Sequence, residues 1–143
     1  MNVRNIAYWA TTGIAAAGLA AGGLGQLSRA PEMVESFAKM GYPAYLLTLL
    51  GVWKVAGALA LLAPRLPRLK ELAYAGILFL TTGAAFSHAM AGDPAGKVVA
   101  PLFVLALAAA SYVLRPASRT LGAPIIEQES TAAAPRPIRS PAT

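Results

Sequence analysis

The sequence predicts an all-α fold: a membrane-embedded four-helix bundle with a short amphipathic helix between the first and second spans. The composition is 57% hydrophobic and only 13% charged, whereas soluble domains carry about 25% charged residues. Four nearly uncharged stretches are each close to the ~20 residues that cross a ~30 Å hydrocarbon core. Basic residues stand at the ends of these stretches, as is typical of transmembrane helices.

The four predicted spans differ in composition. They cover residues 5–26, 45–63, 72–89 and 98–114. The first is rich in small residues, with Gly18 and Gly22 at the G-x-x-x-G spacing that lets helix backbones approach closely in lipid. The last is short, so we expect Lys97 and Arg115 to extend towards the headgroups.

The connection between the first two spans has the features of a short amphipathic helix. Pro31 suits a first helical position, Glu35 and Lys39 have the spacing of an i,i+4 ion pair, and Gly41 can end the helix. The apolar residues that share one face are Met33, Val34, Phe37 and Met40. Such a helix either lies on the membrane surface or caps the bundle.

The remaining connections are a tight loop and a tail. Pro67 can start the third span within the loop 64–71. After Pro116 the chain is rich in Pro, Ala, Ser and Thr, which predicts disorder from about residue 122. The sequence therefore divides into a four-span domain, 1–116, and a cytoplasmic tail, 117–143.

The distribution of Lys and Arg predicts the orientation of the bundle. With four spans, eight basic residues fall on the side of both termini: Arg4, Arg65, Arg68, Lys70, Arg115, Arg119, Arg136 and Arg139. Three fall on the other side: Arg29, Lys39 and Lys97. Because basic flanks stay in the cytoplasm, both termini are expected there. This asymmetry also accounts for the net charge of +6, so no nucleic-acid partner is needed to explain it.

One lysine stands in the middle of a span. Lys54 is about nine residues from each end of the second span, where a lysine costs ~2.5–3.5 kcal/mol on insertion scales. Gly51, Gly57 and Ala58 share its helical face, which suits contact with a neighbouring helix and would turn the ammonium inward. Lys54 either binds an anionic or carbonyl-bearing lipophilic molecule, takes part in proton transfer, or has a structural role.

Further polar side chains are candidates to share a cavity with Lys54. Gln26, Ser87 and His88 lie near the ends of their spans on the side away from the termini. Thr81 is two helical turns from His88 on the same helix face. Trp53 is adjacent to Lys54 and can shape a quinone-sized pocket, whereas Asp93 is expected only to form a turn. One histidine and no cysteine make a poor metal site.

Several linked motifs resemble the DoxX-like family of small bacterial membrane proteins. They are Gly41-Tyr42-Pro43, Gly51-Val52-Trp53-Lys54-Val55-Ala56-Gly57, the run from Leu61 to Glu71, Ala73-Tyr74-Ala75-Gly76, Ser87-His88 and Gly92-Asp93. The resemblance covers roughly residues 5–116 and implies a four-helix protein of the bacterial plasma membrane. It implies candidate roles for Trp53-Lys54, Glu71 and Ser87-His88 but no particular catalytic residue. From the sequence pattern alone, apart from the family resemblance, Glu71 is expected to pair with Arg68 or Lys70.

Two classes of function follow. In the first class, the protein holds a lipophilic small molecule, such as a quinone, or serves a redox system. This class follows from the resemblance, because the wider DoxX group includes a subunit associated with thiosulfate:quinone oxidoreduction. The second is a non-catalytic partner or assembly factor that packs against another membrane protein, or against a second copy, through small-residue faces. The sequence leaves the ligand and any catalysis open.

Overall fold

The computed structural model describes residues 2–116 and 119–121, and it is all-helical over the elements it assigns. Four long helices and one short helix follow in the order α1 (Val3–Leu27), α2 (Pro31–Lys39), α3 (Tyr45–Leu62), α4 (Pro67–Met90) and α5 (Ala95–Leu114). The predicted fold class is confirmed, including the short amphipathic helix after the first long one. The predicted tail beyond about residue 122 lies outside the described residues.

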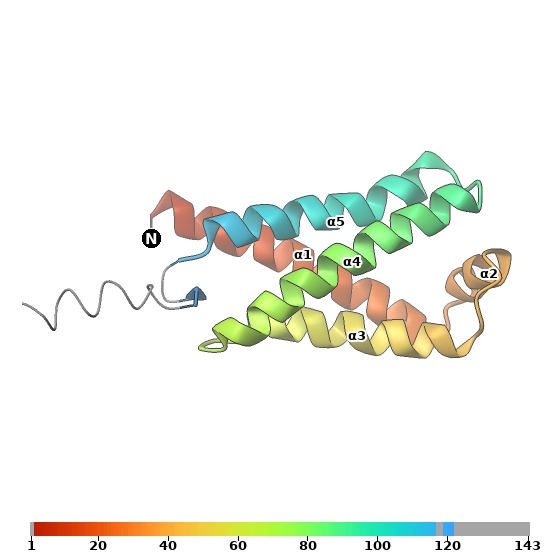
Figure 1. The fold of residues 1–143 in the computed structure, drawn as a ribbon, viewed down its shortest axis with the longest axis horizontal. Coiled ribbons are helices and arrows are strands. Elements are labelled where there is room, and N and C mark those ends of the chain that lie inside the picture. Colours follow the sequence, from red (N-terminus) through yellow and green to blue (C-terminus); the bar gives the residue numbers. More distant parts are fainter. Residues whose placement is uncertain (1, 117–118, 122–143) are drawn as a thin grey trace, which may run out of the picture.

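The long helices form a closed ring of neighbours. α1 packs against α3 and α5, α4 packs against α5, and the contact between α3 and α4 closes the ring less extensively. The helices alternate in direction, so Asn2 and Arg115 lie at one end, the termini end, and α2 covers the opposite end, the α2 end (Figure 1). In Figure 1, α3 and α4 meet near the termini end and diverge towards α2.

Three of these helices, α3, α4 and α5, have the length and hydropathy of membrane spans. α1 is long enough, at 25 residues, but its Gly, Thr and aromatic residues reduce its hydropathy. α1 is also in contact with both α3 and α5, so part of its surface is covered by protein. Three such helices are typical of a multi-pass membrane protein, and a crossing by α1 stays a prediction.

The closest helix contact joins α1 and α3 through two glycines. A Cβ added to Gly23 would lie 2.9 Å from the carbonyl oxygen of Gly51, and one added to Gly51 would lie 3.0 Å from that of Gly23. Real Cβ atoms do not approach backbone this closely, so only glycine fits at both positions. The sequence predicted close packing at Gly18 and Gly22, and the tightest approach is instead at the next residue, Gly23.

Local sequence explains where the elements begin and turn. Pro31 and Pro67 occupy the first positions of α2 and α4, as predicted. Gly41 follows α2 with a φ of +74°, a left-handed conformation that glycine adopts without strain. This turn lets the chain leave α2 and enter α3.

Candidate functional site

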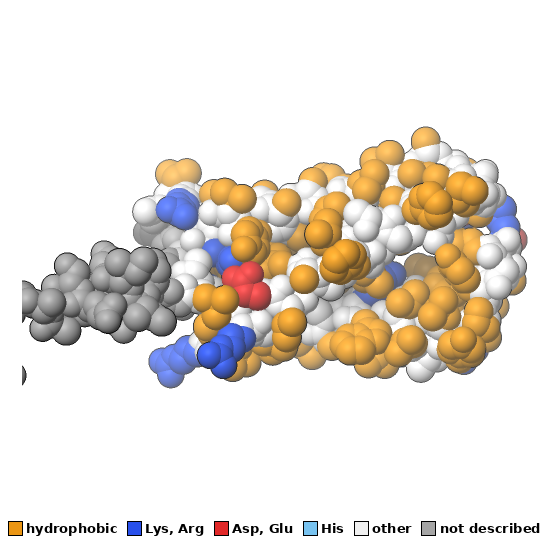
Figure 2. Space-filling view, viewed as in Figure 1, with side chains coloured by type: hydrophobic (Ala, Val, Ile, Leu, Met, Phe, Trp, Pro, Cys, Tyr) orange, Lys and Arg blue, Asp and Glu red, His pale blue; other side chains and the backbone are white. Residues whose placement is uncertain are grey.

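Two cavities lie along the junction of α3 and α4, and each has a volume of about 540 Å³. Figure 2 shows this face hollowed between the two helices, with a basic side chain in the hollow. Four residues line both cavities: Leu50, Lys54, Phe79 and Leu80. Lys54 contributes the only charge common to both linings. We call them the apolar cavity, which extends towards the termini end, and the α2 cavity, which extends beneath α2.

Lys54 lies partly buried among the helices, as its small-residue face predicted. A Cβ added to Gly22 would lie 3.7 Å from Lys54 Nζ and 3.9 Å from its Cδ, so the lysine side chain extends across α1 at a position without a side chain. No hydrogen bond or ion pair joins Nζ to another residue in the described part of the chain. An ammonium in this setting retains its capacity to donate to a ligand.

The apolar cavity surrounds the other side of Lys54. Its walls are almost entirely aliphatic or aromatic, with Trp53, Gly57 and Gly76 among them. Added Cβ atoms at Gly57 and Gly76 would meet no atom of the described chain within 4 Å, so these glycines widen the cavity. Space of this kind suits an apolar chain.

The α2 cavity carries most of the polar groups. Gln26, Ser36, Ser87, His88 and Lys97 line it, together with Glu32. Gln26 is 3% exposed and Ser36 is 9% exposed, and neither Gln26 Oε1 nor Ser36 Oγ has a hydrogen-bond partner in the described structure. Buried polar atoms without partners are uncommon in proteins and call for an explanation.

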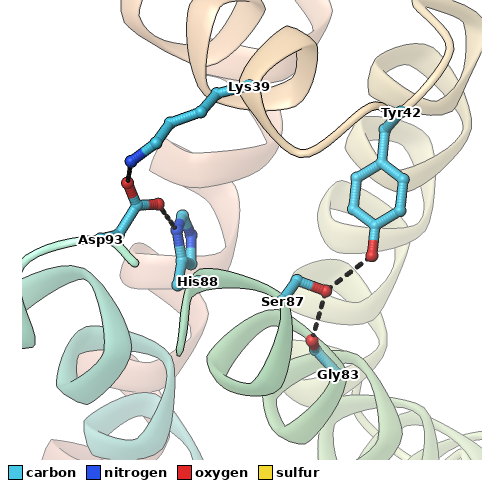
Figure 3. Close-up of polar contacts among 6 residues, drawn as sticks. All are labelled: Lys39, Tyr42, Gly83, Ser87, His88 and Asp93. Atoms are coloured by element: carbon cyan, nitrogen blue, oxygen red, sulfur yellow. Dashed lines mark hydrogen bonds and ion pairs between the residues drawn. The ribbon is translucent and has the colours of Figure 1, made fainter. Parts of the chain in front are cut away.

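Two polar contacts hold the region around α2 to the end of α4 (Figure 3). Lys39 Nζ donates to Asp93 Oδ1 at 2.5 Å, and His88 Nδ1 donates to Asp93 Oδ2 at 2.7 Å. The hydrogen bonds from His88 and Lys39 lower the pKa of the Asp93 carboxyl to about 2. Asp93 therefore joins α2 to α4 and orients the imidazole, leaving Nε2 of a neutral ring as an acceptor.

The second contact joins Tyr42 to Ser87, and the use of each hydroxyl proton shows which group donates. Ser87 Oγ donates to the carbonyl oxygen of Gly83 at 2.8 Å, so its single proton is used. Tyr42 Oη must then donate to Ser87 Oγ, at 2.7 Å (Figure 3). Ser87 lines the α2 cavity with its hydrogen-bonding needs already met, unlike Ser36.

Three sequence predictions about charged residues are wrong: the partner of Lys39, the role of Asp93 and the partner of Glu71. Lys39 does not pair with Glu35, because Asp93 offers a carboxylate that two cations share. Asp93 is accordingly more than a turn residue. The sequence signal for this role of Asp93 was its position just past the end of α4, five residues after His88.

Glu71 is the third case. It pairs with Arg115 at 2.8 Å rather than with Arg68 or Lys70. Lys70 is fully buried and donates to the carbonyl oxygens of Ala60 and Leu61, which are left free at the end of α3. The turn between α3 and α4 thus uses Lys70 as a helix cap.

The structure brings together five of the seven predicted site residues. Gln26, Lys54, Ser87 and His88 line the α2 cavity, and Trp53 lines the apolar cavity beside Lys54. Thr81 is buried but donates to the carbonyl oxygen of Ile77 in its own helix, and it lines neither cavity. Glu71 lies at the termini end. Sequence reasoning missed Ser36, whose place on the inner face of α2 depends on how that helix docks.

A separate polar cluster occupies the termini end. Thr12 donates to the carbonyl oxygen of Tyr8, so Ser111 must donate to Thr12, at 2.6 Å, and Tyr74 must donate to Ser111, at 2.7 Å. The guanidinium of Arg115 lies 4.1 Å from the ring centroid of Tyr112. This cluster joins α1, α4 and α5.

Fold and site together define a multi-pass helical membrane protein with a lysine-lined cavity between two of its helices. The sequence pattern of the DoxX-like family matches residues 10–111, so the chain belongs to the DoxX-like family. It is also 39% identical over 69 residues to an uncharacterized protein, YdgD, of Bacillus subtilis (strain 168). That match covers 48% of this chain and 60% of the relative's length. No solved structure matches the chain.

Proposed function

We propose that this protein binds a lipophilic small molecule between α3 and α4, with Lys54 as the residue that holds its polar group. The observation that carries the proposal is that Lys54 lines both cavities and that its Nζ has no partner among the described residues. Because a buried ammonium without a partner is costly in hydrocarbon, an anionic or carbonyl oxygen on a ligand would stabilise it.

A quinone is one ligand that fits this chemistry. Lys54 can donate to a carbonyl oxygen, the α2 cavity adds polar groups such as His88, and the apolar cavity can take a side chain. Each cavity volume lies within the ~300–1,000 Å³ range of small-molecule sites. The protein would then hold the molecule or act as the membrane subunit of a redox system.

The test compares two variants that each remove one positive charge. Lys54→Met should abolish binding of a panel of quinones to the purified protein, measured by titration calorimetry in detergent, while insertion and expression stay intact. Arg68→Met removes an exposed basic residue that lines neither cavity, so it should bind as the parent does. Equal binding by Lys54→Met and the parent would sink the proposal.

The alternative function, a non-catalytic partner or assembly factor for another membrane protein or a second copy, has less support. Its basis was the small-residue faces, and Gly51, a glycine of one of those faces, already packs against Gly23 within the chain. Gly57, Gly76 and Gly83 line the cavities instead. Crosslinking in native membranes that captures one stoichiometric neighbour would favour this alternative.

We also propose that α1 crosses the membrane and that both termini are cytoplasmic, in a bacterial plasma membrane. The basic residues Arg4, Arg65 and Arg68 belong to the termini end, and Arg29 and Lys97 to the α2 end. Reporter fusions at the two termini should both report the cytoplasm. Opposite locations for the two reporters would contradict a crossing by α1.

A further inference from the structure

We infer that the α2 cavity contains a subsite for a hydroxyl group, formed by Gln26, Ser36 and Lys54, and that the ligand is an amphiphile with a hydroxyl head. The inference rests on the proposed function and specifies the ligand's polar group. Its basis is a set of buried polar atoms without partners, which is separate from the cavity volume.

The first step is the burial of the two side chains. Gln26 is the last buried residue of α1, and Ser36 is the buried residue of α2. Both are at least nine-tenths buried, both line the cavity, and Gln26 Oε1 and Ser36 Oγ lack partners in the described structure. Leaving such an atom unpaired is costly, and a ligand can recover that cost by completing the bonds.

The second step is the position of Lys54, which lies close to Gln26 and lines the same cavity as Ser36. Its ammonium lies near the position where Gly22 would carry a side chain, and Gly22 is four residues before Gln26. Residues four apart share a helix face and are separated by about 6 Å along the axis. A small head group can therefore reach both the ammonium and the Gln26 amide.

The third step is the chemistry of the three groups. Lys54 only donates, the Gln26 carbonyl oxygen only accepts, and the Ser36 hydroxyl does both. A hydroxyl can accept from Lys54 while donating to Gln26 Oε1. If the terminal amide of Gln26 is rotated so that its NH2 group faces the ligand, a hydroxyl can accept from that group instead. A head group with ether or carbonyl oxygens alone would leave Gln26 Oε1 unpaired.

The apolar cavity supplies the other half of the ligand. It shares Lys54 with the α2 cavity and is almost entirely apolar, so a hydrocarbon chain can extend into it from a head group held at the subsite. The structure thus favours a single-chain alcohol or phenol over a compact polar metabolite.

The experiment compares 4-decylphenol with 4-decylanisole, its methyl ether, which has the same chain but no donor. Binding to the full chain in detergent is measured by titration calorimetry. We expect the phenol to bind at least about 10-fold more tightly, corresponding to one recovered buried hydrogen bond of about 1.4 kcal/mol. Gln26→Leu and Ser36→Ala should each reduce this preference and leave affinity for the ether within about 2-fold, which also shows that the variants are folded.

Ser28→Ala is the control, because Ser28 is exposed, lines neither cavity and donates its hydroxyl to the carbonyl oxygen of Gly25. It should keep the preference for the phenol. Equal binding of phenol and ether by the parent, or an unchanged preference in both Gln26→Leu and Ser36→Ala, would overturn the subsite, as would no binding of either probe.

The outcomes separate this inference from the proposed function. If Lys54→Met abolishes quinone binding while the parent does not distinguish phenol from ether, the proposed function stands and the hydroxyl subsite fails. If Lys54→Met binds quinones as the parent does, the proposed function fails, and the subsite fails with it because Lys54 is one of its three groups.

Discussion

The two ends of the bundle are built differently. At the termini end, α1, α4 and α5 are joined by hydroxyl bonds through Ser111 and by the pair between Glu71 and Arg115. At the α2 end, α3 and α4 diverge, α2 covers the gap, and polar atoms of Gln26 and Ser36 stay unpaired over a cavity. At the termini end the hydroxyls of Thr12, Tyr74 and Ser111 bond to one another, and Tyr8 Oη is the unpaired buried hydroxyl there. The difference lies in the surroundings, because the unpaired atoms of Gln26 and Ser36 belong to residues that line a cavity.

The largest expected effect is at the termini end. Glu71→Ala leaves the guanidinium of Arg115, whose side chain is 4% exposed, without its carboxylate. Breaking a buried pair costs about 3–5 kcal/mol, and we expect about 3 kcal/mol because the Glu71 side chain is 29% exposed. Thermal unfolding in detergent, followed by circular dichroism, measures the loss. Glu35→Ala at the exposed face of α2 is the control, and equal unfolding temperatures for both variants would contradict the account.

The contact between α1 and α3 gives the next largest effect. Gly23→Ala places a Cβ 2.9 Å from the Gly51 carbonyl oxygen, so the two helices must separate. Overpacking of this kind costs about 1–3 kcal/mol. Gly13→Ala lies on the same helix, where an added Cβ meets no described atom within 4 Å, and it should unfold at the parent temperature or above. The argument fails if the two substitutions destabilise the protein equally.

Two serines sharpen the comparison directly. Ser111→Ala leaves Tyr74 Oη without its acceptor in the buried cluster, for an expected cost of about 1 kcal/mol. Ser87→Ala at the α2 end removes an exposed hydroxyl whose partner Tyr42 is also exposed, so stability should not change measurably. A larger loss for Ser87→Ala than for Ser111→Ala would reverse the assignment of the two ends.

For Asp93 the expected effect is on the position of α2. Asp93→Asn removes the negative charge that holds Lys39 and His88, so α2 should move away from α4 while the bundle stays folded. The chain has no cysteine, so spin labels on cysteines introduced at Val34 and Met90 can report the distance between α2 and α4. A broader distance distribution is expected in the variant, and an unchanged one would show that Asp93 does not hold α2.

The same labels test the pH dependence of this contact. The pKa of Asp93 is lowered from 3.8 to about 2 by His88 and Lys39. A carboxyl whose pKa is depressed by its partners contributes fully above its unfolded pKa and loses that contribution as pH falls through the folded value. The distance should therefore be constant from pH 8 to pH 5 and broaden only between about pH 4 and pH 2. Broadening near neutral pH would assign the contact to a different group.

Hydropathy and proline positions were enough to predict the helices, and the sequence also named four residues that line the α2 cavity: Gln26, Lys54, Ser87 and His88. Each of these is a local property or follows from helical periodicity. The roles of Asp93, Lys70 and Ser36 were not predictable in this way, because they depend on how α2 docks and how α3 ends. Arg115 was predicted to extend towards headgroups, and its pair with Glu71 exists only because α4 and α5 lie side by side.

The claim that Lys54 holds a lipophilic molecule is tested most directly by mass spectrometry of the gently solubilised protein. The account predicts that a lipophilic molecule co-purifies with the parent and with Arg68→Met and is lost from Lys54→Met. The same molecule at the same occupancy in Lys54→Met, or its absence from the parent, would contradict the account.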